Sequence, residues 1–250
     1  MAKENIIEVQ NLKTYFHTPE GIVKSVDGVS FSIEKGKTMA LVGESGCGKT
    51  QTSLSLIRLL APTAKVSADK IEINGKETKD YTKDQARGIR GKDISMIFQE
   101  PMTSLNPVYR VKRQLEEMIR LHQPELSKQD TYQRALNILT RVGIPEPQER
   151  IRVFPHQLSG GLRQRVMIAI ALASNPRLLI ADEPTTALDV TIQAQIIELL
   201  KEIQKEMEMS ILLITHDFGV VSQMADTVSV MYAGKIVEQG SIPGIHTQGC

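Results

Sequence analysis

One stretch of the sequence decides the fold: Gly43-Glu44-Ser45-Gly46-Cys47-Gly48-Lys49-Thr50. It fits the G-x-x-x-x-G-K-[ST] pattern of a phosphate-binding loop at every position. The glycines let the backbone curl so that successive N–H groups point at phosphate oxygens, and the helix that follows adds the positive end of its dipole. Lys49 is then expected to reach the β and γ phosphates of a nucleotide, and Thr50 to ligate Mg²⁺.

The surroundings of this loop are those of a strand, a loop and a helix in succession. An apolar run at residues 39–42 precedes the loop, and the apolar spacing after it predicts a helix over residues 49–60 that ends before Pro62. The pattern requires this arrangement, which argues against a chance glycine-rich turn. Cys47 is interpreted as part of the cradle rather than as a redox thiol, because a phosphate cradle tolerates many side chains at this position.

A second polar site follows the apolar run at residues 178–181, where Asp182 and Glu183 are neighbours. Open α/β sheets bind ligands at the carboxyl ends of their strands. Adjacent strand residues point in opposite directions, so we expect Asp182 to face the metal while Glu183 polarises a water in line with the γ-phosphorus. The alternative is a solvated acidic turn. Together with the loop, the pair predicts a protein that binds ATP with Mg²⁺.

The composition limits the class of protein. The 250 residues are 41% hydrophobic, which suits a large core, and the net charge of +1 argues against partners such as nucleic acid that are recognised by bulk electrostatics. The two cysteines, Cys47 and Cys250, form neither a disulfide framework nor a metal-ligand cluster, which favours a reducing cytoplasm. The N-terminus lacks an apolar signal core, and the longest apolar run, residues 166–173, is too short to span a bilayer.

The order of the predicted elements indicates an α/β fold with an insertion. Residues 1–100 suggest short strands with an Asn74-Gly75 hairpin, and residues 101–157 suggest helices at 111–121 and 128–142. Residues 158–250 alternate between helices and buried strands before a closing hairpin about Ala233-Gly234. We therefore predict one domain over 1–250. It comprises a phosphate-loop ATPase core with a mixed or parallel sheet and an N-terminal antiparallel β subdomain (1–100 and 158–250), and an inserted helical subdomain (101–157).

A second glycine motif distinguishes this chain from other phosphate-loop proteins. Ser159 is followed by Gly160 and Gly161 at the start of a predicted helix. This makes another anion-binding helix N-terminus, and nothing near it in the sequence could supply the anion. We expect it to receive a phosphate that is held by another subunit.

With this motif in place, the chain resembles the ATP-binding cassette (ABC) family over nearly its whole length. The family signature is residues 158–164, and its other marks occur in order at Gln99, Asp182-Glu183, Asp189 and His216. The resemblance implies that Gln99, Glu183 and His216 are catalytic, with His216 contacting the γ-phosphate, and that Thr50, Gln99 and Asp182 hold the metal. Residues 187–189 would form a loop facing the dimer partner.

The resemblance also implies a set of residues that bind ATP from both subunits. An aromatic residue before the loop would stack on adenine, and Phe16 fits the family spacing better than its neighbour Tyr15, although core packing is an alternative for either. The full set comprises Phe16, Gly43, Glu44, Ser45, Gly46, Cys47, Gly48, Lys49, Thr50, Gln51, Ser159, Gly160, Gly161 and Asp189.

Longer strings at residues 98–107, 154–157 and 182–191 look like those of the ATPase subunits of bacterial dipeptide, oligopeptide and nickel importers. That likeness implies a peripheral subunit on the cytoplasmic face of the inner membrane. Its partners would be a second ATPase subunit, identical or closely related, two membrane permeases, and indirectly an extracytoplasmic substrate-binding protein. Residues 101–157 would be the surface that docks on the permease. Peptides are favoured over nickel as cargo.

Other phosphate-loop classes fit less well. A kinase or GTPase requires an acceptor pocket or a guanine-reading Asn-Lys-x-Asp string, and the sequence has no such string. A cassette ATPase acting on DNA or ribosomes is expected to carry a coiled-coil insertion, duplicated cassettes or a basic face, and a non-catalytic cassette is expected to lack Glu183 or His216. Relatives continue into a proline- and cysteine-containing tail, which here is either truncated or divergent. Because Cys250 alone cannot ligate a cluster that needs four thiolates, we expect no iron-sulfur cluster.

Overall fold

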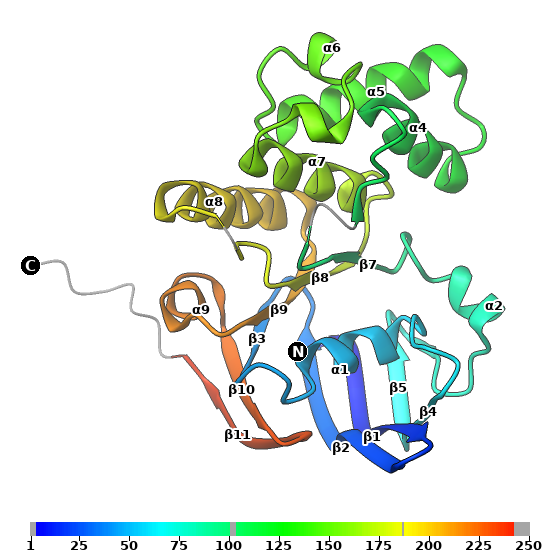
Figure 1. Cartoon of the computed structure of the whole chain (residues 1–250), viewed down its shortest axis with the longest axis vertical. Helices are drawn as coiled ribbons and strands as arrows, with labels where there is room; N and C mark the ends of the chain where they lie inside the picture. Colours follow the sequence, from blue (N-terminus) through cyan, green and yellow to red (C-terminus); the bar gives the residue numbers. More distant parts are fainter. Residues whose placement is uncertain (1–3, 101–103, 187, 243–250) are drawn as a thin grey trace, which may run out of the picture.

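The computed structural model describes residues 4–100, 104–186 and 188–242, and Figure 1 shows two sheets with a group of helices at one end. The first sheet is antiparallel, with strand order β2-β1-β5-β6 and β4 paired to β1. Its strands are β1 (Asn5–Thr18), β2 (Gly21–Glu34), β4 (Ala64–Ser67), β5 (Lys70–Ile73) and β6 (Lys76–Glu77). The expected antiparallel N-terminal sheet is therefore confirmed.

The expectation of short strands was wrong for β1 and β2, which are 14 residues long each. Their pairing contains four register shifts, and Asn11 within β1 has a φ of 51°. Each shift interrupts the two-residue alternation of buried and exposed side chains, so one long strand gives the sequence pattern of several short ones. The Asn74-Gly75 turn between β5 and β6 is confirmed, with φ values of 51° and 73°.

The second sheet has the strand order β11-β10-β3-β9-β8-β7 and is parallel except for the β10–β11 hairpin. Its strands are β3 (Thr38–Val42), β7 (Ile94–Ile97), β8 (Leu178–Asp182), β9 (Ser210–Thr215), β10 (Thr227–Tyr232) and β11 (Lys235–Ser241). All residues of β3, β8 and β9 are buried. Because parallel strands end at one edge, the segments that follow β3, β7, β8 and β9 meet there.

The helices that the sequence predicts occur in the expected order, whereas the short segments at residues 83–87, 147–150 and 155–157 were not predicted. The described helices are α1 (Lys49–Leu56), α2 (Lys83–Arg87), α4 (Val111–His122), α5 (Lys128–Arg141), α6 (Pro147–Arg150), the 3-10 turn η1 (Pro155–Gln157), α7 (Gly160–Leu172), α8 (Val190–Met207) and α9 (Phe218–Met224). Helix α1 ends four residues earlier than predicted, because Arg58 has a φ of 55° and Arg90 donates to the carbonyls of Ile57 (2.7 Å) and Arg58 (3.0 Å). None of the described helices is long and apolar enough to cross a membrane.

Two hydrophobic clusters hold the layers together. One packs α4, α5, α7 and α8 against one face of the parallel sheet, and the other packs the antiparallel sheet and α1 against its opposite face. In Figure 1, α4, α5 and α6 lie beyond α7, on the side of the molecule away from the antiparallel sheet. The phosphate loop between β3 and α1 contacts both sheets, at Ser25 of β2 and Met231 of β10.

Candidate functional site

The phosphate loop is shaped by close approaches that only glycine permits. Gly43 has a φ of 156°, and a Cβ atom there would lie 2.2 Å from the carbonyl oxygen of Met231 in β10. Gly48 has a φ of 109°, and its Cβ would lie 2.2 Å from the carbonyl oxygen of Ser25 in β2. The loop is therefore pressed between strands of the two sheets, which fixes the direction of its N–H groups.

Lys49 is held beneath this loop. Its Nζ donates to the carbonyl oxygens of Gly43 (2.7 Å) and Glu44 (2.8 Å), and the residue is 5% exposed. Cys47 is also buried, with its Sγ 3.9 Å from Nζ, and its interpretation as part of the cradle stays a prediction. The ammonium is thus placed in advance at the point where a nucleotide's phosphates would enter.

A polar cavity of about 240 Å³ opens above the loop. Residues from three predicted motifs meet around it: the loop itself, the end of β7 and the end of β8. Its lining comprises Ser25, Ser45, Gly46, Gly48, Lys49, Thr50, Gln51, Gln99 and Glu183. The structure therefore brings Gln99 and Glu183, which are 84 positions apart in sequence, to the phosphate loop.

Three side chains hold the Glu183 carboxyl. Gln99 Nε2 donates to Oε2 at 3.0 Å, the Thr186 hydroxyl donates to the same oxygen at 2.8 Å, and His216 Nδ1 lies 3.3 Å from Oε1. The Glu183 side chain is 14% exposed, whereas that of His216 is 66% exposed. The Glu183 carboxyl is therefore oriented and partly screened from water, and its Oε1 atom faces the exposed side chain of His216. Thr186 was missed in the sequence, although its spacing of three residues from Glu183 suits such a contact.

The geometry that separates the two acids differs from the expectation. Glu183 has a φ of 45°, so the chain leaves the extended conformation directly after Asp182. The acids are therefore set apart by a left-handed turn and not by strand alternation. This turn is anchored by the Glu183 N–H, which donates to the Ile214 carbonyl in β9 at 2.8 Å.

Asp182 is buried, at 1% exposure, and burial raises the pKa of its carboxyl to about 6, against a smaller lowering by the hydrogen bond from the Thr50 hydroxyl. Its Oδ1 atom has no hydrogen-bond partner among the described residues. A buried carboxylate oxygen without a partner, beside a hydroxyl, offers the hard oxygen ligands that Mg²⁺ prefers. The described residues contain no cluster of three His, Cys, Asp or Glu side chains, so phosphate oxygens and water would have to complete the coordination of such an ion.

The buried carboxyl predicts a pH-dependent stability for the nucleotide-free chain. Because the pKa of about 6 in the folded chain is above the ordinary carboxyl value of 3.8, Asp182 is protonated in both the folded and the unfolded chain below about pH 4 and does not affect stability there. As pH rises from about 4 to 6, ionisation of the buried Asp182 carboxyl lowers the free energy of unfolding, and this loss reaches about 3 kcal/mol above that range. Asp182→Asn should therefore be more stable than the native chain at pH 8, and the difference should disappear at pH 4. Urea unfolding of both chains across this range measures it, and a pH-independent difference would contradict the assignment.

Ser159, Gly160 and Gly161 do not line this cavity. They border a different hollow, of about 580 Å³, together with Leu188 and Asp189. Ser159 caps α7, with its hydroxyl accepting from the Leu162 N–H at 3.4 Å, and Asp189 caps α8, accepting from the Ile192 N–H at 3.0 Å. The motif and the loop that follows Glu183 therefore form one face of the molecule, separate from the phosphate cavity of the same chain.

The remaining expected residues are placed as follows. Tyr15 donates its hydroxyl to Asp27 at 2.5 Å, and the Lys24 ammonium lies 5.5 Å from the centre of its ring. Phe16 pairs with Val23 of β2 and Ala64 of β4, and neither aromatic residue lines the phosphate cavity. The choice of Phe16 as the adenine-stacking residue therefore stays a prediction. Residues 101–103, Ala187 and Cys250 lie outside the described residues.

Comparisons with known proteins give the same family as the motifs. A family model described as "ABC transporter" matches residues 26–186. The dipeptide transport ATP-binding protein DppD of Bacillus subtilis (strain 168) is 54% identical, over 98% of this chain and 73% of its own length. The oligopeptide transport ATP-binding protein OppD of the same organism is 50% identical (96% and 67%), and DppD of Escherichia coli (strain K12) is 48% identical (96% and 73%).

Solved structures agree with the fold. The dimeric structure of MJ0796, a bacterial ABC transporter cassette, superposes with a TM-score of 0.83 at 28% identity, covering 96% of this chain and all of that one. Its post-hydrolysis state bound to ADP and Pi superposes with a TM-score of 0.84. The α/β fold and the resemblance expected from residues 158–164 are thereby confirmed. Because the family model spans more than half of the chain, and relatives share about half of its residues along nearly its whole length, this chain belongs to the ABC transporter family.

Proposed function

We propose that this chain is the ATP-hydrolysing subunit of an importer that drives the uptake of di- or oligopeptides through partner permeases, working at the cytoplasmic face of the inner membrane. The observation that carries the proposal is the Glu183 carboxyl at the phosphate cavity, held by Gln99 and Thr186 with His216 beside it. An ATPase needs a fixed carboxylate near the γ-phosphate to orient the attacking water. The names of the relatives, which are dipeptide and oligopeptide transport proteins, supply the cargo.

The catalytic work is positioning and charge neutralisation. Backbone N–H groups of residues 43–48 and the N-terminus of α1 hold the β-phosphate, and Lys49 moves its donors from the loop carbonyls to phosphate oxygens. Thr50, Gln99 and Asp182 would hold Mg²⁺, whose charge would offset that of the phosphates. Glu183 accepts a proton from water or orients it, and His216 contacts the γ-phosphate from the end of β9. Phe16 stacks on the adenine.

The site is completed by a second subunit, a copy of this chain or a close relative. Ser159, Gly160 and Gly161 open α7 on a face that does not reach the phosphate cavity of the same chain. A helix N-terminus of this kind favours an anion, and in a head-to-tail dimer the partner's ATP supplies it. Asp189, in the loop on the same face, then lies against the partner.

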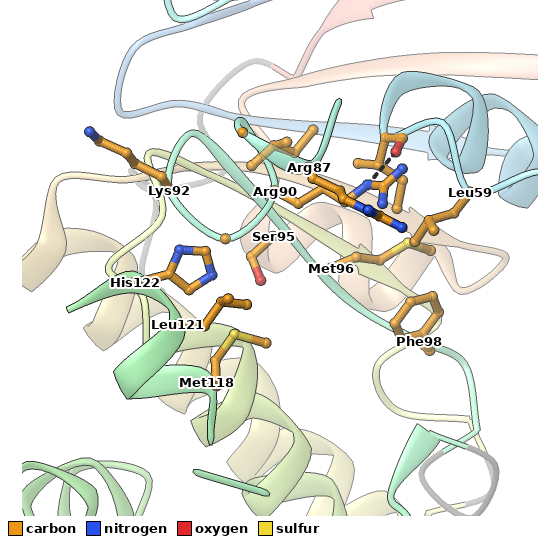
Figure 2. Close-up of a pocket in the computed structure, with 14 residues that line it drawn as sticks. Leu59, Arg87, Arg90, Lys92, Ser95, Met96, Phe98, Met118, Leu121 and His122 are labelled. Atoms are coloured by element: carbon orange, nitrogen blue, oxygen red, sulfur yellow. Dashed lines mark hydrogen bonds between the residues drawn. The ribbon is translucent and has the colours of Figure 1, made fainter. Parts of the chain in front are cut away.

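A groove between the core and α4 is the proposed docking site for a permease helix (Figure 2). It has a volume of about 760 Å³. Met118, Leu121 and His122 of α4 lie on one side, opposite Met96 and Phe98 of the core. Leu121 is 71% exposed and Phe98 37% exposed, so both present apolar surface to a partner.

The charges at this groove indicate the chemistry of the permease segment. Arg87 and Lys92 are exposed at its edge, and burial lowers the pKa of His122, which keeps that side chain neutral at pH 7. An amphipathic helix with apolar anchors and acidic flanks complements this lining. Residues 101–157, proposed as the helical subdomain, therefore supply one side of the docking surface through α4, and the core supplies the rest.

Copurification from membranes tests the proposed function. We expect the tagged chain to recover two permeases and, through them, a peptide-binding protein; recovery of a nickel-binding protein instead would overturn the choice of cargo. Leu121→Asp should remove most of the recovered permease because it places a charge in the apolar groove, while the hydrolysis rate of the isolated subunit stays within about twofold. Val237→Asp is the matched control, since Val237 is 61% exposed on β11, outside the groove. Equal losses in both variants would contradict the docking site.

A further inference from the structure

Asp217, the neighbour of His216, forms hydrogen bonds through both of its carboxyl oxygens and through its backbone N–H. Its Oδ1 accepts from the backbone N–H groups of Gly219 (2.7 Å) and Val220 (3.3 Å), which caps α9. Its own N–H donates to the Thr215 hydroxyl at 3.0 Å. Its Oδ2 accepts from Gln193 Nε2 at 2.9 Å, and this bond is the largest cause of the lowered pKa of the carboxyl. The backbone that carries His216 is therefore fixed from β9, from α9 and from α8.

Gln193 is the only one of these partners that lies outside the β9–α9 loop region. It belongs to the first turn of α8, the helix that Asp189 caps. Its neighbour Ile192 packs on the glycine motif so closely that a Cβ atom on Gly161 would lie 2.9 Å from Ile192 Cγ2. The first turn of α8 thus contacts the Ser159-Gly160-Gly161 motif through Ile192, and it contacts the loop that carries His216 through Gln193.

We propose that Gln193 is a positioning residue that ties the His216 loop to α8, so that the arrangement of the dimer-facing surface sets the position of His216 relative to Glu183. The inference rests on the proposed roles of Glu183 and His216. The separation of 3.3 Å between His216 Nδ1 and Glu183 Oε1 is at the long end of hydrogen-bond range, so a small shift of the loop breaks this contact. Misplacement of a catalytic group by about 1 Å can cost up to about a hundredfold in rate.

Gln193→Ala is the direct test. Alanine is a better helix former than glutamine, so α8 should remain intact and the midpoint of thermal unfolding should be nearly unchanged. The kcat for ATP should fall by about tenfold or more, whereas the KM and the Kd for ATP stay at native values because Gln193 does not line the phosphate cavity. Gln193→Lys, which restores a donor toward Asp217, should recover most of the lost rate.

The controls separate positioning from general destabilisation. Gln133→Ala is matched, because Gln133 is also a helical glutamine with a side-chain partner, Asn137 at 3.0 Å, but lies in α5, away from the site. In a double-mutant cycle, Asp217→Ala should lower kcat less in the Gln193→Ala background than in the native chain, since both substitutions break the same bond and the α9 cap is lost equally in both backgrounds. A native kcat in Gln193→Ala, no recovery in Gln193→Lys, or additive losses in the cycle would overturn the inference.

Glu183→Gln distinguishes this inference from the proposed function. If Glu183→Gln abolishes hydrolysis while Gln193→Ala keeps the native kcat, the positioning role of Gln193 fails and the proposed function stands. If Glu183→Gln hydrolyses ATP at the native rate, the proposed function itself fails.

Discussion

Glu183→Gln is expected to lower the rate of ATP hydrolysis by about a thousandfold and to leave the Kd for ATP unchanged. The amide has nearly the shape of the carboxyl and keeps an oxygen for the Gln99 and Thr186 donors, so the pocket is preserved. It cannot accept a proton, and general-base catalysis contributes about a hundredfold to ten-thousandfold. Phosphate release and equilibrium nucleotide binding measure the two quantities separately.

The matched control for this variant is Glu198→Gln on α8. Glu198 is an exposed acid whose nearest cation is Lys201, at 3.5 Å, and it lies outside both hollows. This variant should hydrolyse ATP at the native rate. Native activity in Glu183→Gln would show that the carboxyl has no part in the chemistry, and a loss of ATP affinity in that variant would show that it acts in binding instead.

Gly160→Asp should prevent two subunits from closing on one ATP, while each chain alone can still bind ATP. Gly160 has an ordinary helical backbone, and the nearest atom to a Cβ there is Leu188 Cδ2 at 3.9 Å, so the substitution fits sterically. An acid in the first turn of a helix even favours α7 in the isolated chain. The added carboxylate, however, repels the partner's γ-phosphate at the point where the two subunits close on ATP.

The expected result is a hydrolysis rate lower by about a hundredfold or more with an unchanged Kd for ATP in the isolated chain, because like charges brought together in a closed interface cost several kcal/mol. Gly160→Ala is the control, since it adds a small uncharged side chain at the same place and should keep most of the activity. Full activity in Gly160→Asp would contradict the shared site, and a parallel loss in Gly160→Ala would point to packing instead of charge.

The elements that carry the site could be predicted because their signals are local. The loop at residues 43–50, the apolar strands before it and before Asp182, and the glycines after Ser159 each combine a pattern with its structural context. Because the strands β3, β7, β8 and β9 are parallel and buried, their carboxyl ends had to meet, and Gln99 and Glu183 do meet at the loop. The closing hairpin was also predictable, since Ala233 and Gly234 adopt φ values of 44° and 81°.

What could not be predicted depends on contacts between distant segments. The left-handed turn at Glu183 is held by a hydrogen bond to the Ile214 carbonyl in β9, and no residue type near Glu183 predicts such a turn. The bond between Gln193 and Asp217 joins two polar residues 24 positions apart, each ordinary for a helix or a cap. The lengths of β1 and β2 were hidden by register shifts, and the groove beside α4 takes one of its sides from the core, which no local pattern records.

ATP bound by the phosphate loop of one chain is expected also to join that chain to a second one. Light scattering on the Glu183→Gln variant tests it most directly, because this substitution blocks hydrolysis and preserves the bound nucleotide. We expect a monomer without nucleotide and a particle of twice the mass with ATP and Mg²⁺, and we expect the added Gly160→Asp substitution to restore the monomer. If the mass of the Glu183→Gln variant stays that of a monomer in saturating ATP, bound ATP does not join two chains.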